Sequence, residues 1–421
     1  MRDILVTLIV FGTIPFIFSR PYVGIYVASW LGYMNPHRLT WGFAYTMPFS
    51  AIITICLITA MFFSKEKNKL PINRITVFWM FFISLTVITS IFALNPDGAT
   101  EELTRFVKIQ IVIFCTLLLI NNRQKLNYLV WTIALSIGFF GIKGGVFSIL
   151  TGLQHRVLGP PGSFIAENNT MSLAILMVIP LFYFLYKTAG IKYIKMGLIA
   201  AIVLCVISVI ASYSRGAFIT ILVLAFFLWI SSKNKLIIML FIFLFSISIA
   251  PFIPDKWYDR MDTIKTYEQD ESANLRLNSW GFAINLANDR PIFGGGFRTF
   301  TKDAFALYSP DPDFNKAYDA HSIYFEVLAE HGYLGFFLYS FMWVFVFIQI
   351  YRLKKRAKES KDSWLYNLMW MVQLSLIAYM TGGAFLGLAY FDLPYHLMSI
   401  VVIAGSLVNK VNAEGSQERA K

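Results

Sequence analysis

The feature that most constrains this chain is the recurrence of apolar segments, each near the length of a membrane span, along almost the whole sequence. A helix needs about 20 residues to cross the hydrocarbon core of a bilayer. The 421 residues are 57% hydrophobic and only 14% charged, a balance typical of chains that fold in lipid. The sequence therefore predicts an all-α, polytopic integral membrane protein. The apolar segments run at 4–18, 21–34, 47–63, 75–94, 106–120, 126–150, 171–186, 193–213, 217–230, 236–253, 331–351, 364–389 and 393–409.

We expect about 12 transmembrane helices (12 or 13), because segments 4–18 and 21–34 are short and form either one broken span or a tilted pair. Cytoplasmic loops of membrane proteins collect Lys and Arg, and here basic loops alternate with the others. The basic loops, expected in the cytoplasm with the C-terminal tail, lie at 64–74, 121–125, 187–195, 231–235 and 352–362. The loops expected on the outer side lie at 35–46, 95–105, 151–170, 214–216, 254–330 and 390–392.

The charge and the motifs exclude several other classes of protein. The net charge of +12 does not indicate nucleic-acid binding, since Lys and Arg are scattered between apolar segments instead of gathered on one soluble face. The three cysteines lie inside apolar runs and are expected to pack as small core residues. The histidines form no HxH or HExxH pair, and the chain has no G-x-x-x-x-G-K-[ST] motif. We therefore expect neither a metal site nor a bound cofactor.

The outer loop 254–330 is long enough to form a small subdomain. Residues 254–320 hold eleven acidic and eight basic residues, a net charge of −3. The stretch that begins at Asn274 has helical spacing and is expected to end before Arg290-Pro291, because a residue before proline avoids the α region. The stretch "FGGGF" is expected to form a tight, flexible turn. The predicted apolar face of the helix consists of Leu277, Trp280, Ile284 and Ala287.

Arginines at the outer membrane boundary and in this loop are the first candidates for chemistry. Arg215 opens an apolar span, Arg276 lies on the predicted loop helix, and Arg290 and Arg298 flank the glycine turn. A guanidinium offers a planar fork of donors that fits phosphate oxygens. From the residues alone, Arg215 is also consistent with a membrane anchor and Arg276 with a surface arginine stacked on Trp280. The cluster inside an acidic loop favours phosphate binding, because two phosphates need local positive charge.

Three further residues complete the candidates. Lys143 lies between glycines in an apolar span, where a charge costs roughly 2.5–3.5 kcal/mol, so we expect it to line an internal cavity. Arg156 follows in an outer loop, as a binding residue or as part of a turn. His321 stands where the long loop re-enters the membrane, and a neutral imidazole there can take a proton from a sugar hydroxyl. Glu326 and Glu330 share a helical face about 140° away and are poor candidates to orient it.

Several stretches resemble a known family. "SRGAF", "RLNSW", "NDRPIFGGGF" and "AHSIYFEVLAEHGYLGFFLY" are similar to motifs of the O-antigen ligase and polysaccharide polymerase superfamily of bacterial inner membranes. The N-terminal "MRDILVTLIV" and "YMNPHRLTWGFAY", with the central "GIKGGVFSILTGLQHRVLGPPGSFIAENN", resemble more narrowly the O-glycosylation ligases associated with exosortase A systems. The resemblance covers nearly the whole chain.

The resemblance implies a metal-independent, inverting glycosyltransferase of the all-helical GT-C type, without a cofactor. Such an enzyme moves a glycan from undecaprenyl diphosphate to a hydroxyl of a protein, lipid or glycan acceptor on the periplasmic face of the inner membrane. By the same resemblance, Arg215 and Arg276 bind the diphosphate and His321 is the base. The superfamily often has asparagine after this histidine; Ser322 stands here, in keeping with a distinct branch.

The resemblance also divides the chain. Residues 1–186 are expected to form an N-terminal transmembrane region typical of the exosortase-associated branch, 187–409 the ligase-like membrane domain with periplasmic loop 254–330, and 410–421 a cytoplasmic tail. A ligase is the preferred function. A polymerase that adds the glycan to another copy of itself shares this architecture. A transporter or flippase of lipid-linked glycans, using intramembrane charges such as Lys143, is the alternative from another class.

Overall fold

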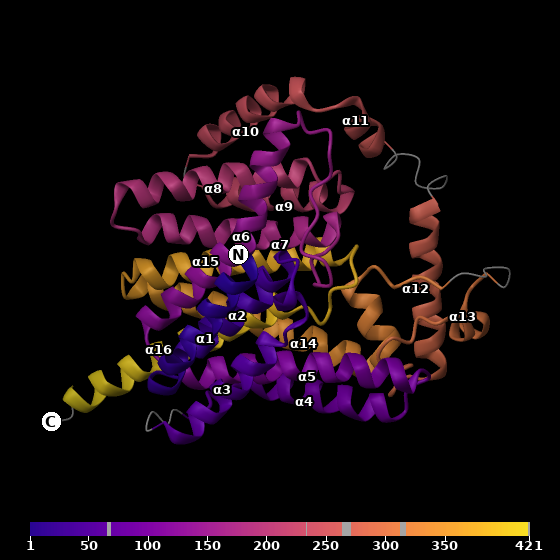
Figure 1. Ribbon diagram of the computed structural model, residues 1–421, viewed down its shortest axis with the longest axis horizontal. Coiled ribbons are helices and arrows are strands. Elements are labelled where there is room, and N and C mark those ends of the chain that lie inside the picture. The colour runs from indigo at the N-terminus through magenta and orange to yellow at the C-terminus, as the bar shows by residue number, and fades with distance from the viewer. Residues whose placement is uncertain (65–68, 233, 263–270, 312–316, 420–421) are drawn as a thin grey trace.

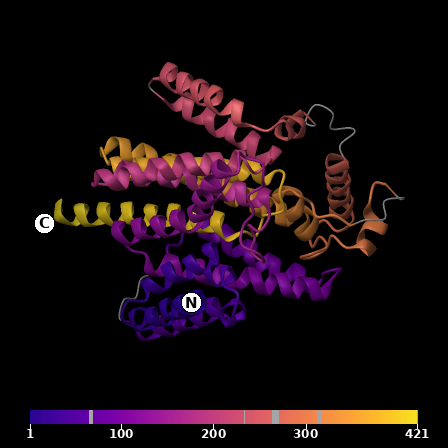
Figure 2. The same cartoon turned by 45° about the horizontal axis from the view of Figure 1, so that its top comes forward.

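The computed structural model describes residues 1–64, 69–232, 234–262, 271–311 and 317–419. All regular secondary structure in these ranges is helical, so the all-α expectation is confirmed. Most of the helices lie side by side along the long axis of the molecule (Figure 1). Helices α12 and α13 lie beyond one end of this bundle, and the C-terminus lies at the opposite end (Figures 1 and 2).

The helices form an N-terminal group, up to α6, and a C-terminal group that begins with α7. The first group comprises α1 Arg2–Ser19, α2 Tyr22–Met34, η1 Pro36–Leu39, η2 Phe43–Thr46, α3 Phe49–Phe63, α4 Arg74–Ile91, α5 Pro96–Leu119 and α6 Arg123–Leu150. The second comprises α7 Asn168–Thr188, α8 Lys192–Ile210, α9 Arg215–Ser231, α10 Lys235–Ile249, η3 Ala250–Phe252, α11 Asp255–Asp262, α12 Glu271–Asp289, α13 Lys302–Tyr308, α14 Ile323–Glu359, α15 Ser363–Gly383 and α16 Asp392–Arg419.

Within the described ranges, seven helices are long and apolar enough to cross a membrane. They are α1, α4, α6, α7, α8, α14 and the Asp392–Lys410 part of α16. Helices α3 and α9 are apolar but shorter. These helices agree with a polytopic membrane protein. The expected number of 12 or 13 spans stays a prediction.

The first two helices lie side by side as a pair. Both pack against α3, and Val10, Leu31 and Phe49 from the three helices are fully buried in one apolar cluster. A Cβ atom on Gly24 of α2 would lie 3.0 Å from the Leu57 side chain on α3. Of the two expected arrangements, one broken span and a tilted pair, the structure therefore contains the pair.

The expected outer loop at 95–105 is wrong, because these residues form the first turns of α5. The Asn95 side chain accepts a hydrogen bond from the Gly98 N–H at 3.2 Å and caps the helix, and Pro96 occupies the first helical position. Both are strong helix-start signals. The charged residues of this stretch therefore lie on a helix that continues into an apolar segment.

The outer loop has a small core of its own, and the face that its helix α12 buries overlaps the predicted face only in part. Phe282 and Leu286 are fully buried, and so is Ala287 of the predicted face, whereas Leu277 and Ile284 are exposed and Trp280 is half-buried. The Phe282 ring stacks on Phe305 of α13 with 4.3 Å between centroids. The contacts with α13 and α14 select the Phe282 face. The predicted end of the helix before Arg290 is confirmed.

The glycine turn is tight, as expected, but it is fixed by backbone hydrogen bonds. The Gly295 N–H donates to the Ala329 carbonyl and the Gly296 N–H to the Glu330 carbonyl, both at 2.8 Å. These acceptors lie just before a kink in α14 at Gly332, whose φ is 64°. A Cβ on Gly332 would lie 2.5 Å from the Pro291 carbonyl oxygen. Only glycine fits this close approach of two backbones without strain.

Replacing Gly332 by alanine is therefore expected to destabilise the protein. At φ 64° and ψ −170°, Gly332 lies in a region that is essentially restricted to glycine and costs another residue about 1–3 kcal/mol, and the contact with Pro291 adds to it. The control is Gly197→Ala on α8, where a new Cβ meets nothing within 4 Å. Thermal unfolding of the purified variants in detergent should show a lower midpoint for Gly332→Ala alone. Equal midpoints would contradict the proposed tight contact.

Candidate functional site

Three arginines from separate elements line one cavity of about 220 Å³, here called the arginine cavity. Arg156 comes from the loop after α6, Arg215 is the first residue of α9, and Arg276 lies on α12. Among the described residues, no Asp or Glu lines this cavity. The three guanidinium groups offer planar forks of donors that suit an anion with several oxygens, such as a diphosphate.

Two helix N-termini also open onto the arginine cavity. Asn168 begins α7 and donates a hydrogen bond from its side chain to the Ser212 carbonyl at 2.8 Å. Ser214 caps α9 by accepting from the Ala217 N–H at 3.2 Å. Backbone N–H groups at the start of a helix carry partial positive charge and bind phosphate. The two helix N-termini therefore add partial positive charge to that of the three arginines.

A second cavity of about 610 Å³ adjoins the first and contains His321; it is here called the histidine cavity. Leu386 lines both cavities. Glu167 and Thr170 line the histidine cavity, while Asn168 and Asn169 between them line the arginine cavity, so the start of α7 separates the two. The carboxylates of the histidine cavity are Glu102, Glu167, Asp319, Glu326 and Glu330.

His321 is positioned by its backbone and by α12. Its φ of 43° lies in the left-handed region, which non-glycine residues seldom adopt and which is frequent at functional sites. The Trp280 indole donates a hydrogen bond to the carbonyl of Ala320, the preceding residue, at 2.9 Å. The same indole stacks on Phe325. Helix α12 therefore carries Arg276 and also holds the segment that carries His321.

The surroundings of His321 favour its neutral form. Burial and the positive charge of Arg276 lower the pKa of the imidazole below its ordinary value of 6.5, and the negative charges of Asp319 and Glu167 partly offset this. Within the described part of the chain, the ring has no hydrogen-bond partner and it lines the cavity. A neutral imidazole facing a cavity can accept a proton from a bound hydroxyl.

The two glutamates of α14 bond elsewhere, as their position on the helix predicted. The Glu326 carboxylate accepts from the Ala389 N–H at 2.9 Å. The Glu330 carboxylate accepts from the Arg298 N–H at 2.7 Å and from the Tyr390 hydroxyl. They hold the wall of the histidine cavity together.

The remaining candidates lie apart from the three arginines. Arg298 lines the histidine cavity, but its guanidinium bonds the Glu102 carboxylate at 2.8 Å and so ties the glycine turn to α5. Arg290 donates to the Phe92 carbonyl and lines neither cavity.

Lys143 is exposed on α6. The expectation that Lys143 lines an internal cavity is wrong, because the glycines beside it, not the lysine, face the neighbouring helices: a Cβ on Gly145 would lie 2.2 Å from the Leu204 carbonyl of α8.

Most residues of the histidine cavity, including Glu167 and Asp319, were not among the sequence candidates. Two of them, Glu102 and Arg105, lie on α5, in the stretch expected to be a loop. The signal was present, because polar residues recur there every three or four positions, as on one face of a helix. Arg105 also lies over the Phe164 ring, 3.5 Å from its centroid.

Two family models match this chain. Residues 200–340, which include Arg215, Arg276 and His321, match the family described as O-antigen ligase. Residues 1–190 match a family of unknown function (DUF5935). No curated protein gives a significant match. The first match supports the O-antigen ligase superfamily and hence a membrane protein with a glycosyl-transferring, polysaccharide-related activity.

Removing the charge of Arg276 should change the pKa of His321. Replacing Arg276 by glutamine removes a cation that opposes protonation, so the pKa of His321 should rise toward its ordinary value. NMR of histidine-labelled protein in detergent, with the signal assigned by His321→Gln, measures this pKa. Lys302→Gln, an exposed site in the same loop, is the matched control. An unchanged or lowered pKa in Arg276→Gln would show that the two side chains do not interact.

Proposed function

We propose that this protein is a glycosyltransferase of the ligase type, which moves a glycan from undecaprenyl diphosphate to an acceptor hydroxyl at the outer face of the bacterial inner membrane. The observation that carries the proposal is the adjacency of the arginine cavity and the histidine cavity, with Leu386 in the wall of both. A diphosphate bound at Arg156, Arg215 and Arg276 would direct its first sugar toward His321. The family match over residues 200–340, which contain Arg215, Arg276 and His321, supports the same class of reaction.

The residues present can perform the transfer by direct displacement. Neutral His321 removes the proton of the acceptor hydroxyl as its oxygen bonds to the anomeric carbon of the donor sugar. The bond from that carbon to the phosphate oxygen breaks, and the lipid diphosphate leaves with the electron pair. The arginines stabilise the charge on the leaving group, a role that a metal ion fills in other transferases. A single displacement inverts the configuration at the anomeric carbon.

The charge of the histidine cavity suits the sugar in this reaction. Three acidic residues outside α14, Glu102, Glu167 and Asp319, line it together with two arginines, Arg105 and Arg298. Glycosyl transfer passes through a transition state with positive charge on the sugar ring, which nearby carboxylates stabilise. The histidine cavity thus holds carboxylates for the sugar, and the described lining of the arginine cavity holds arginines for the diphosphate.

The finer parts of the proposal concern topology and family. The alternating basic loops support a periplasmic position for both cavities, with the C-terminal tail in the cytoplasm. The α12–α13 end and the C-terminus lie at opposite ends of the helix bundle (Figure 1). The GT-C architecture, the relationship to exosortase-associated ligases and the domain boundaries at 186 and 409 belong to the same proposal.

The polymerase and the transporter, the two alternative functions, differ in how well they fit the cavities. A polymerase would use the same cavities, with the acceptor being a second lipid-linked glycan. A transporter would use intramembrane charges such as Lys143, but Lys143 is exposed on α6 and lines neither cavity. The transferase therefore has the stronger support.

The first test is His321→Ala. Loss of a general base should lower the rate constant for transfer about 10²- to 10⁴-fold while leaving donor binding intact. Transfer is measured with full-length protein in detergent and lipid-linked glycan as donor. Transfer at the wild-type rate would remove His321 from the mechanism. In cells, the glycans left on the lipid identify the branch, since a failed ligase leaves long unattached chains and a failed polymerase leaves single repeat units.

The second test is Arg215→Ala and Arg276→Ala. Each removes a charged donor worth about 1.5–3 kcal/mol, so the affinity for undecaprenyl diphosphate should fall roughly 10- to 150-fold. Arg215→Lys keeps the charge and should recover part of the loss, since only the planar fork is missing. Lys302→Ala controls for a general loss of positive charge in the loop. Wild-type affinity in both arginine variants would place the diphosphate elsewhere.

A further inference from the structure

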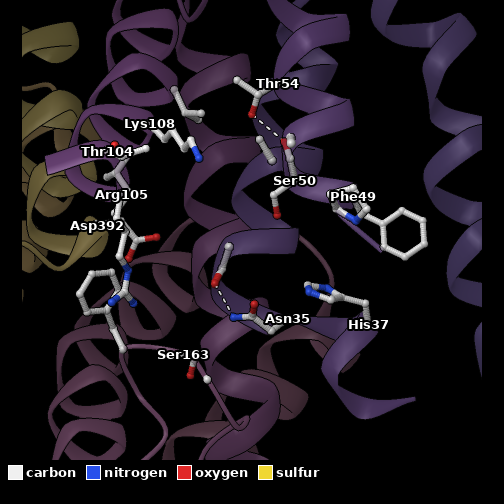
Figure 3. Close-up of a pocket in the computed structure, with 18 of the residues that line it drawn as sticks. Asn35, His37, Phe49, Ser50, Thr54, Thr104, Arg105, Lys108, Ser163 and Asp392 are labelled. Carbon is white, nitrogen blue, oxygen red and sulfur yellow. Dashed lines mark hydrogen bonds between the residues drawn. The ribbon is translucent and has the colours of Figure 1, made fainter. Parts of the chain in front are cut away.

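We propose that the acceptor binds in a third cavity, built by the N-terminal helices, and that it presents a neutral, polyhydroxylated group such as a glycan. The cavity has a volume of about 1190 Å³ and is here called the N-terminal cavity (Figure 3). Its walls come from α2, η1, η2, α3, α5, the 162–164 segment and the start of α16. The inference rests on the proposed transferase function and assigns a role to the region that matches a family of unknown function.

The first observation is continuity with the histidine cavity. Arg105, Ser163 and Phe164 line both spaces. The arginine, histidine and N-terminal cavities therefore form a series, with the second in the middle. A donor held at the arginines and an acceptor held in the N-terminal cavity would meet beside His321.

The second observation is a polar stripe on α5. The residues of α5 that line the cavity recur at helical spacing from the first turn to the middle of the helix, and beyond them the lining continues with apolar side chains. Thr104, Arg105 and Lys108 extend from this helix in Figure 3. A polar face on a membrane helix is costly unless it meets water or a polar ligand. The polar members of the stripe are Asp97, Thr100, Glu101, Thr104, Arg105 and Lys108.

The third observation is the balance of charge. Three cations, Arg38, Arg105 and Lys108, line the N-terminal cavity. Three acidic residues, Asp97, Glu101 and Asp392, match them in number, and two histidines, His37 and His396, complete the titratable lining. Hydroxyl groups of a sugar both donate and accept hydrogen bonds, and a lining that mixes cations, acidic groups and hydroxyls satisfies both roles. This mixed lining lacks the excess of cations that a dense anion such as a diphosphate needs.

The fourth observation is the presence of buried polar atoms that lack partners. Ser29 on α2 and His37 on η1 line the cavity and are 3% and 9% exposed. Within the described residues, the Ser29 hydroxyl and the His37 Nδ1 form no hydrogen bond. The His37 ring nitrogen points toward the interior of the cavity in Figure 3. Buried polar groups are normally satisfied, and a ligand that brings hydroxyls into this cavity would satisfy both.

The test places a large side chain in the N-terminal cavity and leaves the residues of the arginine cavity unchanged. Thr104→Trp on α5 and Ala51→Trp on α3 each put a large ring into the N-terminal cavity from an exposed side chain. The matched control is Ile111→Trp, also exposed on α5 but outside the cavity lining. Full-length protein in detergent receives lipid-linked glycan as donor and, as acceptor probe, membranes from cells that lack this chain. Initial rates are measured against the amount of each substrate.

We expect both cavity variants to raise the half-saturating amount of acceptor membranes about tenfold or more, with unchanged dependence on donor, while Ile111→Trp behaves as wild type. Acceptor membranes oxidised with periodate, which cleaves vicinal diols, should no longer compete with untreated membranes. Wild-type acceptor dependence in both cavity variants overturns the site, and undiminished competition by oxidised membranes overturns the glycan chemistry. If wild-type protein transfers nothing from donor to probe, the proposed function fails; if it transfers and the cavity variants match it, only this inference fails.

Discussion

The hydrogen bonds between the glycine turn and the kink of α14 hold the outer subdomain on the membrane helices. They join the backbone of residues 291–296 to that of 329–333, so they depend on glycine and not on any side chain. The positions of Arg276 and His321 depend on this contact. Helix α12 leads directly into the turn, and α12 carries Arg276 and positions His321 through Trp280. Without this attachment, the arginine cavity would lose one wall and the segment that carries His321 would lose its support.

The sequence predicted the all-helical fold of a polytopic membrane protein, but not how its candidate site residues are arranged in space. Arg215, Arg276 and His321 are separated by up to about a hundred positions along the chain, and only tertiary packing brings the two cavities together. For Lys143, the predicted position of the side chain in an internal cavity was wrong. Its glycines explain why helices approach there, and the lysine itself points outward. A composition rule for charged residues in membranes does not tell which side of a helix a given charge takes.

The helix faces in the outer part of the chain were the least predictable. For α12, two apolar stripes compete, and the aromatic contact of Phe282 with Phe305 decides between them. For α5, the acids at its start have the composition of a loop, although Asn95 and Pro96 are ordinary helix-start residues. In both cases local preference was compatible with two outcomes and a contact from distant sequence selected one.

The kink at Gly332 also determines how far His321 lies from the continuous apolar part of α14. The nine residues from Ile323 to His331 form a helical piece of about 14 Å, too short to cross a bilayer, and the continuous apolar helix starts only after the kink. In the proposed topology, this piece holds His321 above the hydrocarbon by a distance that the backbone sets. The phosphates of the proposed lipid-linked donor would lie in one layer at the membrane surface. With His321 at a fixed height, such a donor would reach it by diffusion within the plane of the membrane.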